Sequence, residues 1–453
     1  MSNPSPLTAL VGIIASSVQA LESAYSQQGA AFPSLDEPYS PGPLNNDATV
    51  AATTRLIVAA AHQLIATVRE PLETIHDYAP GMYMSASLGL VTDINVPEVL
   101  KDAPTGLHVD AIAEKVEVDS GKLARVMRYL ATRHVFKEVS PDVFANNRVS
   151  SVLVKAHPLE ELKTNKVTKY VGATGAAIVG HITDEGLTSA PFIIDYIRDS
   201  PKDALAPFNL AYKTKATLWD WYEEPGNEWR GLRFATAMTG GGERFPPTIF
   251  TEGFDWKSLK EGSIVVDVGG SVGSVTFAIA SAFPHLKYIV QDLAKVVDDP
   301  GQKFWQERSP QSISSGAVTL QAHSFFDPQP VKNAAVYFMR LVLHDWPEDT
   351  CIAILKHLRA AAGPSSKLII FDMLMPYACP DPAGGPPPPP APLLANLGIA
   401  IGGFITAVDL QMLNFFNGQE RTLKQFITLG AATGWKFEAV NPGPLAALVF
   451  STV

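Results

Sequence analysis

Apolar positions in the second half of the chain alternate between short β-branched runs and helical repeats. Runs typical of buried strands lie at residues 263–268, 287–291, 317–322, 334–339 and 367–373, with a last pair near 436–451. Helical spacing lies between them at residues 273–283, 293–307 and 348–362. Strands that alternate with helices favour parallel pairing with helices on both faces. We therefore expect an α/β fold with a Rossmann-like, doubly wound sheet.

The first half of the chain shows mainly helical periodicity. Residues 7–24 predict an amphipathic helix, 27–47 an extended connector rich in proline and polar residues, 48–76 a longer helix, and 83–100 another. Residues 158–245 indicate further helices with a high density of aromatic residues. Such aromatics are typical of a core, and they would also suit a pocket for a flat, apolar small molecule.

Residues 107–148 have the pattern of a helix-turn-helix followed by a wing. A helix over 109–115, capped by Asp110, precedes a second helix over 122–133 and two short strands at 135–139 and 143–145. The second helix carries Lys122, Arg125, Arg128 and Arg133, which would suit DNA recognition. The alternative is a purely structural or dimerisation module. The net charge of −10 and the cofactor pattern downstream favour this alternative.

These patterns predict two regions. Residues 1–155 form a helical N-terminal region with the winged-helix module at about 80–150, and residues 156–453 hold substrate-binding helices and a catalytic domain whose core begins near 260. The N-terminus lacks the basic segment and cleavage site of a signal peptide. No uninterrupted apolar run approaches eighteen residues; the stretch 393–408 comes closest. We expect a cytoplasmic enzyme, with a proline-rich surface loop at 380–392.

A glycine-rich turn follows the strand near 264. It has the spacing D-x-G-x-S-x-G, formed by Asp267, Gly269, Ser271 and Gly273, and the next strand ends in Asp292. A strand–turn–helix of this kind lets the backbone approach a ligand, and an acid about twenty residues later can bind both ribose hydroxyls. The spacing differs from the dinucleotide motif G-x-G-x-x-G. The pattern therefore predicts a nucleotide-type cofactor, although glycine-rich turns also occur for structural reasons alone.

His344 is the candidate general base, because it follows the strand near 334–339 at the edge where ligands bind in such sheets. Asp372 and Glu420 are candidates to orient its imidazole, since a paired carboxylate fixes the tautomer. Asp345 and Arg421 are interpreted as structural. The sequence has no nucleophile elbow and no spacing typical of a metal site. Its two cysteines exclude a disulfide framework.

Four ordered motifs, at residues 266–273, 290–293, 340–346 and 418–422, resemble those of the caffeate-type O-methyltransferases of plants and fungi, which depend on S-adenosylmethionine. The resemblance covers nearly everything after residue 80 and is greatest to fungal members. It implies a homodimer formed through the winged-helix region, with the partner closing part of the pocket, and no metal.

The resemblance also assigns residues position by position. In the cofactor site it places Asp267, Gly269, Gly273, Asp292, Leu293, Ser324, Phe325 and Arg340, with Phe326 beside the adenine. Asp292 would bind the ribose hydroxyls. His344 would deprotonate the acceptor hydroxyl between Asp372 and Glu420, and Phe234, Met238 and Phe415 would line the substrate. Three positions depart from the family pattern: Ser271 replaces a glycine, Ser324 an aspartate and Asp372 a glutamate.

We therefore expect an O-methyltransferase that acts on a phenolic or enolic small molecule in secondary metabolism. The main alternative is a non-methylating pericyclase or dehydratase, because some fungal relatives of this kind keep the cofactor only as a fixed positive charge. His344, present with both acids, favours methyl transfer. A DNA-binding winged-helix regulator is the third hypothesis, and a salt-dependent shift of a DNA duplex would support it.

Overall fold

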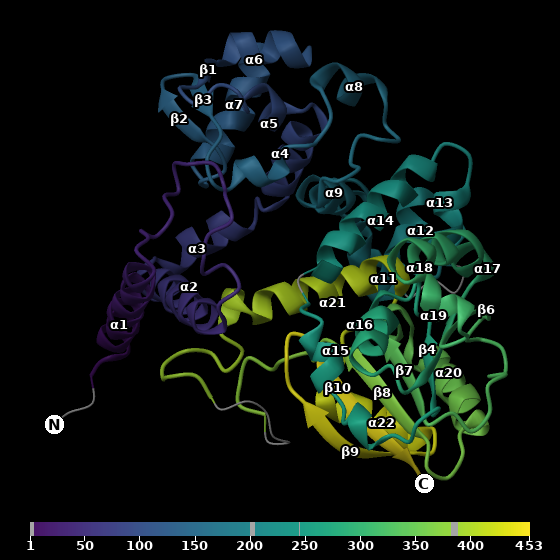
Figure 1. The fold of residues 1–453 in the computed structure, drawn as a ribbon. Coiled ribbons are helices and arrows are strands. Elements are labelled where there is room, and N and C mark those ends of the chain that lie inside the picture. Colours follow the sequence, from purple (N-terminus) through teal and green to yellow (C-terminus); the bar gives the residue numbers. More distant parts are fainter. Residues whose placement is uncertain (1–3, 200–203, 244, 382–387) are drawn as a thin grey trace. The chain divides into compact units, whose positions relative to one another are not determined.

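A computed structural model describes residues 4–199, 204–243, 245–381 and 388–453 of the chain (Figure 1). Residues 382–387 of the proline-rich loop thus lie outside the described part. The chain folds into two compact units. The first contains residues 1–244 and 388–404, and the second contains residues 245–387 and 405–453. Each unit is described by itself.

The second unit is built on a seven-stranded sheet with the order β6-β5-β4-β7-β8-β10-β9. The strands are β4 (Ile264–Val268), β5 (Lys287–Asp292), β6 (Val318–Ala322), β7 (Val336–Arg340), β8 (Lys367–Asp372), β9 (Trp435–Asn441) and β10 (Ala446–Thr452). The first five pair in parallel, and β10 runs antiparallel to both β8 and β9. This topology confirms the predicted Rossmann-like fold.

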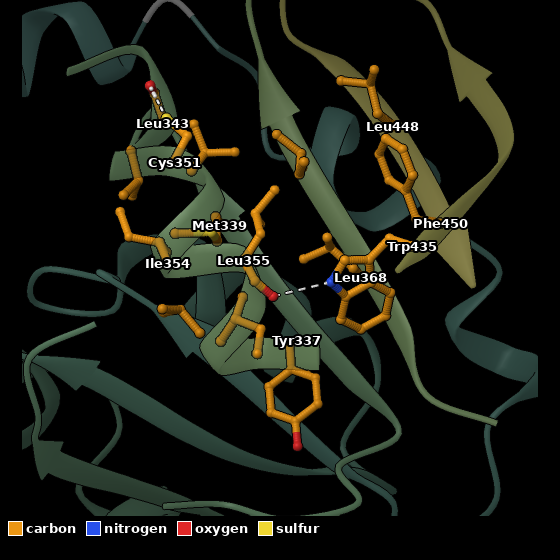
Figure 2. Close-up of a cluster of buried hydrophobic side chains, with 14 of the residues drawn as sticks. Tyr337, Met339, Leu343, Cys351, Ile354, Leu355, Leu368, Trp435, Leu448 and Phe450 are labelled. Atoms are coloured by element: carbon orange, nitrogen blue, oxygen red, sulfur yellow. Dashed lines mark hydrogen bonds between the residues drawn. The ribbon is translucent and has the colours of Figure 1, made fainter. Parts of the chain in front are cut away.

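Helices cover both faces of this sheet. They are α15 (Thr248–Glu252), α16 (Ser274–Ala282), α17 (Ala294–Val296), α18 (Gln302–Arg308), α19 (Pro310–Ser314), α20 (Glu348–Ala361), α21 (Gly402–Phe416) and α22 (Leu423–Ala432). One apolar core joins the sheet to α20 and α22, and a second joins it to α15, α16 and α18. Figure 2 shows part of the first core, where the Trp435 indole donates a hydrogen bond to the carbonyl of Leu355. Because both faces are covered, the central strands are mostly apolar, with polar residues near their ends.

The first unit contains the winged-helix module. Its strands β1 (Leu107–His108), β2 (Lys137–Ser140) and β3 (Val143–Ala145) form a small sheet in the order β1-β3-β2 beside α6 (Val109–Val116) and α7 (Ser120–Ala131). The prediction that Asp110 caps the first helix was wrong. His108 is the N-cap, and its imidazole accepts a hydrogen bond from the backbone N–H of Asp110. Asp119 caps α7.

Among the described residues, ten further helical segments of the first unit follow this module. They are η1 (Ser150–Leu153), α8 (Leu159–Thr164), α9 (Thr174–His181), η2 (Ile182–Gly186), α10 (Leu187–Ser189), η3 (Ala190–Phe192), α11 (Ile193–Asp199), α12 (Pro207–Tyr212), α13 (Leu218–Glu223) and α14 (Glu228–Glu243), while η7 (Gly398–Ala400) belongs to the returning segment. The helices that we expected to bind substrate therefore pack within the first unit.

Three predicted helices are interrupted. Residues 48–76 form α2 (Ala48–Val68) and α3 (Pro71–Tyr78), and residues 83–100 form α4 (Met82–Asp93) and α5 (Val96–Val99) with Asn95 in the left-handed region between them. Residues 293–307 form α17, a π-helical turn η5 (Val297–Gly301) and α18. Proline lacks a backbone N–H, and Pro71, Pro97 and Pro300 lie at or next to these interruptions.

The first two helices, α1 (Pro6–Gln27) and α2, pack side by side (Figure 1). By length and composition alone, both are long and apolar enough to cross a membrane, and most of their residues lie outside the buried core. The sequence pattern predicts no such segment, and its longest apolar stretch lies at 393–408 instead.

Candidate active site

The glycine turn after β4 is shaped by its own packing. The carboxylate of Asp267 is buried and accepts a hydrogen bond of 2.7 Å from the hydroxyl of Thr276 on α16. Gly270 lies directly over it, so that a Cβ at this position would come within 2.5–2.7 Å of the carboxylate. Gly273 adopts a positive φ of 85° and faces the indole of Trp305. The glycines therefore hold the turn closed over Asp267.

Asp292 ties the end of β5 to this turn. One carboxylate oxygen accepts the backbone N–H of Ser271 at 2.8 Å, and the other accepts the N–H of Leu293 at 2.8 Å. Each oxygen of an ionised carboxylate has two acceptor positions, so one on each remains for a ligand. This arrangement fits a vicinal diol such as a ribose. Ser271 adopts a positive φ of 54°, the conformation that the family's glycine would favour.

Three aromatic rings stand beside the turn. The ring of Phe325 lies close to Gly269, since a Cβ added at this glycine would be 3.5 Å from it. Phe325 also packs edge-on against Phe326. Trp346 packs edge-on against both rings. Phe326 and Leu293 are about half exposed. The combination of apolar rings and an acid with free acceptor positions fits the adenosine part of S-adenosylmethionine. The Ser324 hydroxyl accepts a hydrogen bond from the backbone N–H of Phe326. The serine that replaces the family's aspartate therefore stabilises the local turn.

The candidate catalytic cluster forms where η6 (Leu343–Asp345), β8 and the segment before α22 meet. Nδ1 of His344 lies 2.7 Å from Oε1 of Glu420, and Nε2 lies 3.5 Å from Oδ1 of Asp345. One donor or acceptor atom each of His344, Asp372 and Glu420 lies within 4.8 Å of the other two. The structure therefore brings together the three residues predicted as base and orienting acids.

Two carboxylate oxygens in this cluster have no hydrogen-bond partner among the described residues. They are Oδ2 of Asp372 and Oε2 of Glu420, and both side chains are almost fully buried. Buried polar atoms are usually paired, and exceptions mark functional sites or protons shared between groups. These two oxygens therefore leave the cluster able to hold an additional proton.

The pKa values of the cluster reflect burial and mutual interaction. Burial opposes the charged form of His344, but the charge of Asp345 and the hydrogen bond to Glu420 outweigh it and raise the pKa of His344 to about 10. Burial raises the pKa of Asp372 to about 7 and that of Asp345 to about 6. Groups that interact this strongly titrate together, so the cluster retains its protons to a higher pH than isolated groups would.

Arg421 and Gly418 hold His344 in place. The fully buried guanidinium of Arg421 donates hydrogen bonds to the carbonyl of Leu343 at 2.6 Å and to the carbonyl of Trp346 at 2.9 Å. The backbone of Gly418 lies so close to the carbonyl of His344 that a Cβ would collide with it. Arg421 is therefore structural, as expected. It acts by donating hydrogen bonds to backbone carbonyls of the turn that carries His344.

Arg340 connects the two parts of the site. It ends β7, which lies between β4 and β8 in the sheet, and its charge interacts with both Asp267 and Asp372. Burial lowers its pKa, and its Nε has no hydrogen-bond partner among the described residues. A partly buried cation between two buried acids offsets part of the free-energy cost of their charges.

The structure treats the three predicted substrate residues differently. Phe415 is buried on α21. Phe234 and Met238 lie on α14 in the first unit, where Phe234 packs edge-on against His181 and Trp219 and Met238 is exposed. Their role as a substrate wall stays a prediction.

Two of the four basic residues named for this helix, Arg128 on α7 and Arg133 just beyond it, have local partners. Arg128 pairs with Asp142 at 2.6 Å, and Arg133 lies over the ring of Tyr129 and pairs with Asp77 at 3.6 Å. Cations engaged in this way are less available for phosphate groups. The structure therefore gives no support to the DNA-binding hypothesis for this module.

Sequence reasoning assigned no role to Thr276 or to Trp346, and it interpreted Asp345 as structural, whereas the structure places Asp345 3.5 Å from Nε2 of His344. Trp346 and Asp345 adjoin His344 in the chain, and this adjacency was a usable signal. Thr276 had no comparable signal, because only the fold of α16 over the turn brings its hydroxyl to Asp267.

Comparison with known proteins decides the family. Residues 250–436 match the model of the O-methyltransferase domain, and residues 76–156 match the model of the O-methyltransferase dimerisation domain. An O-methyltransferase of Armillaria gallica is 37% identical over 96% of this chain and 96% of its own. The 4-O-methyltransferase 1 of Phanerochaete chrysosporium is 37% identical over 97% of this chain and 96% of its own. The chain belongs to the O-methyltransferase family.

Solved structures agree on the fold of this O-methyltransferase. Mitomycin 7-O-methyltransferase aligns with a TM-score of 0.64 at 23% identity, over 84% of this chain and 97% of its own. A structure described as a pericyclic reaction enzyme aligns with a TM-score of 0.64 at 19% identity, over 97% of this chain and 99% of its own. At these identities the likeness concerns the fold alone. The enzyme is a class I methyltransferase that uses S-adenosylmethionine, and its dimerisation domain supports a homodimer.

Proposed function

We propose that this O-methyltransferase methylates a phenolic or enolic hydroxyl of a small molecule of secondary metabolism, in the cytoplasm, with His344 as general base. The observation that carries the proposal is the contact of 2.7 Å between Nδ1 of His344 and Glu420. Because Glu420 accepts the Nδ1 proton, the tautomer that it favours leaves Nε2 of the neutral imidazole unprotonated, 3.5 Å from Oδ1 of Asp345, as the nitrogen that would take the substrate proton. Asp372 and Glu420 are positioning residues that act through the imidazole.

The chain's own residues fit the methyl donor. Asp292 would hold the ribose hydroxyls, Phe325 and Phe326 would flank the adenine, and the turn around Gly269 and Gly273 would approach the remainder. When bound, S-adenosylmethionine supplies an electrophilic methyl group on a sulfonium. Most of the rate enhancement then comes from holding the acceptor oxygen in line with this methyl and from removing its proton.

The proton transfer is balanced when the base and the acceptor have similar pKa values. The pKa of His344 is about 10, and an ordinary phenol such as the tyrosine side chain has a pKa near 10. The neutral imidazole can therefore take a phenol proton with little free-energy cost. Since the neutral form becomes more abundant as the pH rises towards 10, we expect the rate of methyl transfer to increase with pH above neutrality.

The test is a labelled transfer reaction. The purified protein is incubated with methyl-labelled S-adenosylmethionine and a panel of phenolic acids, flavonoids and polyketides, and the products are analysed by mass spectrometry. We expect a product that carries one labelled methyl, together with an equal amount of S-adenosylhomocysteine. If the donor binds but is never consumed, even with a native extract that supplies the acceptor, the methyl-transfer proposal is wrong and a non-methylating reaction such as a pericyclic or dehydration step takes its place.

A further inference from the structure

The cluster of His344, Asp372 and Glu420 has the composition of a transition-metal site. One ring nitrogen and one oxygen from each carboxylate all lie within 4.8 Å of one another. Imidazole nitrogen and carboxylate oxygen are ligands of zinc, and three protein ligands with a fourth position open to water is a common zinc arrangement. Within the described part of the chain, no other three histidine, cysteine or acidic side chains come together in this way.

The fold, and not the sequence, assembles these three side chains. His344 lies in η6, Asp372 ends β8, and Glu420 comes shortly before α22. Metal sites are recognised in a sequence when their ligands are closely spaced. Because these three lie far apart along the chain, the sequence pattern gives no sign of a metal site.

Two carboxylate oxygens without partners are the strongest argument for an ion. Oδ2 of Asp372 and Oε2 of Glu420 have no hydrogen-bond partner among the described residues, although these residues are only 1% and 3% exposed. Their other oxygens are engaged: Oδ1 of Asp372 accepts the backbone N–H of Met373 at 2.9 Å, and Oε1 of Glu420 lies 2.7 Å from the imidazole of His344. A buried polar atom without a partner costs free energy, and coordination to a cation satisfies it.

The charges around the cluster also favour a cation. Two further acids adjoin it: Asp345 lies 3.5 Å from the imidazole, and the carboxylate of Asp409 accepts the backbone N–H of Glu420 at 2.8 Å. Arg340 and Arg421 supply two positive charges. The acids therefore outnumber these cations, and a divalent ion would reduce the repulsion between the carboxylates.

The geometry needs little adjustment to hold an ion. Bonds from zinc to nitrogen or oxygen ligands are about 2.1 Å long, so two ligand atoms of a tetrahedral site lie about 3.4 Å apart. The contact of 2.7 Å between His344 and Glu420 and the upper limit of 4.8 Å lie on either side of this value. Small side-chain rotations are therefore enough. The side chain of His344 is 13% exposed, which gives the ion an entry from solvent.

We propose that the cluster of His344, Asp372 and Glu420 binds a divalent transition-metal ion such as Zn²⁺, and that the bound ion inhibits the enzyme. The methyl group of S-adenosylmethionine is already electrophilic, so its transfer needs no Lewis acid, and an ion here occupies the groups that would take the substrate proton. Mg²⁺ prefers oxygen ligands and an octahedral site, so it should bind more weakly. The metal binding stands on the geometry, whereas the inhibition rests on the proposed role of His344 as base.

The binding is tested by calorimetric titration of the full chain, without a histidine tag, with zinc chloride. We expect one ion per chain. Glu420→Gln and Asp372→Asn each remove a charged ligand. Changes to outer-shell partners alone cost about 10- to 100-fold in metal affinity, so each variant should raise the dissociation constant at least about 100-fold.

The matched control for the binding is Glu161→Gln. His157 and Glu161 form a histidine–carboxylate pair at 3.2 Å, but this pair is partly exposed and belongs to no group of three. We expect this variant to bind zinc like the wild type. Circular dichroism and calorimetric binding of S-adenosylhomocysteine show which variants fold, and either ligand variant alone is sufficient for the test.

The inhibition is tested in the labelled transfer reaction. We expect saturating zinc to lower the rate at least tenfold, a chelator to restore it, and the same concentration of Mg²⁺ to leave it unchanged. The proposal is overturned if zinc does not bind, if it binds the wild type and the folded ligand variants equally, or if the zinc-bound enzyme transfers methyl at the full rate. A protein that binds zinc through these ligands but never transfers a methyl group supports the metal site and contradicts only the proposed function.

Discussion

Asp267 lies one residue before the end of β4 and Asp372 ends β8 of the same sheet, and burial raises the pKa of each carboxyl to about 7. Their surroundings differ. The carboxylate of Asp267 accepts a hydrogen bond from the hydroxyl of Thr276 and lies under the turn at Gly270. Asp372 has one carboxylate oxygen without a hydrogen-bond partner among the described residues, and it lies beside His344. Burial and a perturbed pKa therefore do not identify a catalytic group. The unsatisfied oxygen beside a titratable partner distinguishes the two.

The largest effect is expected from Glu420→Gln, which changes the candidate catalytic cluster around His344 and Asp372. The amide can present a donor where Nδ1 of His344 now has an acceptor, so the imidazole loses the tautomer with a free Nε2. We expect kcat to fall about 10²- to 10⁴-fold, the range typical of general-base catalysis, and the pH–rate profile to change. Calorimetry should show unchanged binding of S-adenosylhomocysteine. A loss of less than tenfold would show that Glu420 does not position the base.

Asp292→Ala tests the candidate cofactor site, where the end of β5 contacts the glycine turn after β4. Charge-assisted hydrogen bonds contribute about 1.5–3 kcal/mol each, so loss of the contacts to both ribose hydroxyls should weaken cofactor binding at least about 100-fold. The measurement is calorimetry with S-adenosylhomocysteine, and Asp298→Ala, an exposed aspartate nearby, is the control. Equal affinities for the wild type and Asp292→Ala would mean that the ribose is held elsewhere.

Asp372→Asn and Asp267→Asn test whether the two buried aspartates have different roles, one beside the base and one under the glycine turn. We expect Asp372→Asn to lower kcat about tenfold and to change the pH–rate profile, because the amide cannot share a proton with the cluster. Asp267→Asn should leave that profile unchanged. If both substitutions alter the pH–rate profile in the same way, the two aspartates do not have different roles.

Asp267→Asn should instead change how stability depends on pH. The folded pKa of Asp267, about 7, lies above the usual value near 3.9, so the folded state binds the proton more tightly. The stability that this group contributes is fully present below about pH 4 and is lost as the pH rises through 7. In urea unfolding at pH 5 and pH 8, the wild type should therefore lose more stability than the variant between the two values.

The smallest effects are expected from a matched pair of glycine substitutions. Gly270→Ala crowds the carboxylate of Asp267, and Gly418→Ala crowds the backbone at His344. Each should cost about 1–3 kcal/mol of stability through overpacking. Gly270→Ala should raise the dissociation constant of the cofactor severalfold and Gly418→Ala should lower kcat severalfold. Gly121→Ala, where an added Cβ meets only an ordinary contact of 3.4 Å, is the control. If Gly270→Ala lowered kcat and Gly418→Ala weakened cofactor binding instead, the cofactor site and the catalytic cluster would not have the separate roles assigned to them.

The fold and the centre of the site could be predicted from the sequence for a physical reason. Buried parallel strands must be apolar along their length, so β4, β5, β7 and β8 were visible, and polar residues at their ends marked His344 and Asp372. The strand order then brings these ends together. Arg340 lies between the two aspartates for the same reason.

Features that depend on which surface is covered could not be predicted. The apolar residues of α1 and α2 look like core in the sequence, and only packing shows that one flank is exposed. Helix α21 was not among the predicted elements, and Gly402 and Gly403 lie at its start. Helix α22 had an overlooked signal, since Thr422 and Gln425 form a capping box.

The most direct test of the account compares two acceptors in the His344→Ala variant. With an ordinary phenol of pKa near 10, the variant must lose its base, and kcat should fall about 10²- to 10⁴-fold. With an acidic phenol of the same shape that is already ionised at the assay pH, no proton has to be removed, so the loss should shrink to less than tenfold. Equal losses with both phenols would contradict the assignment of His344 as the base.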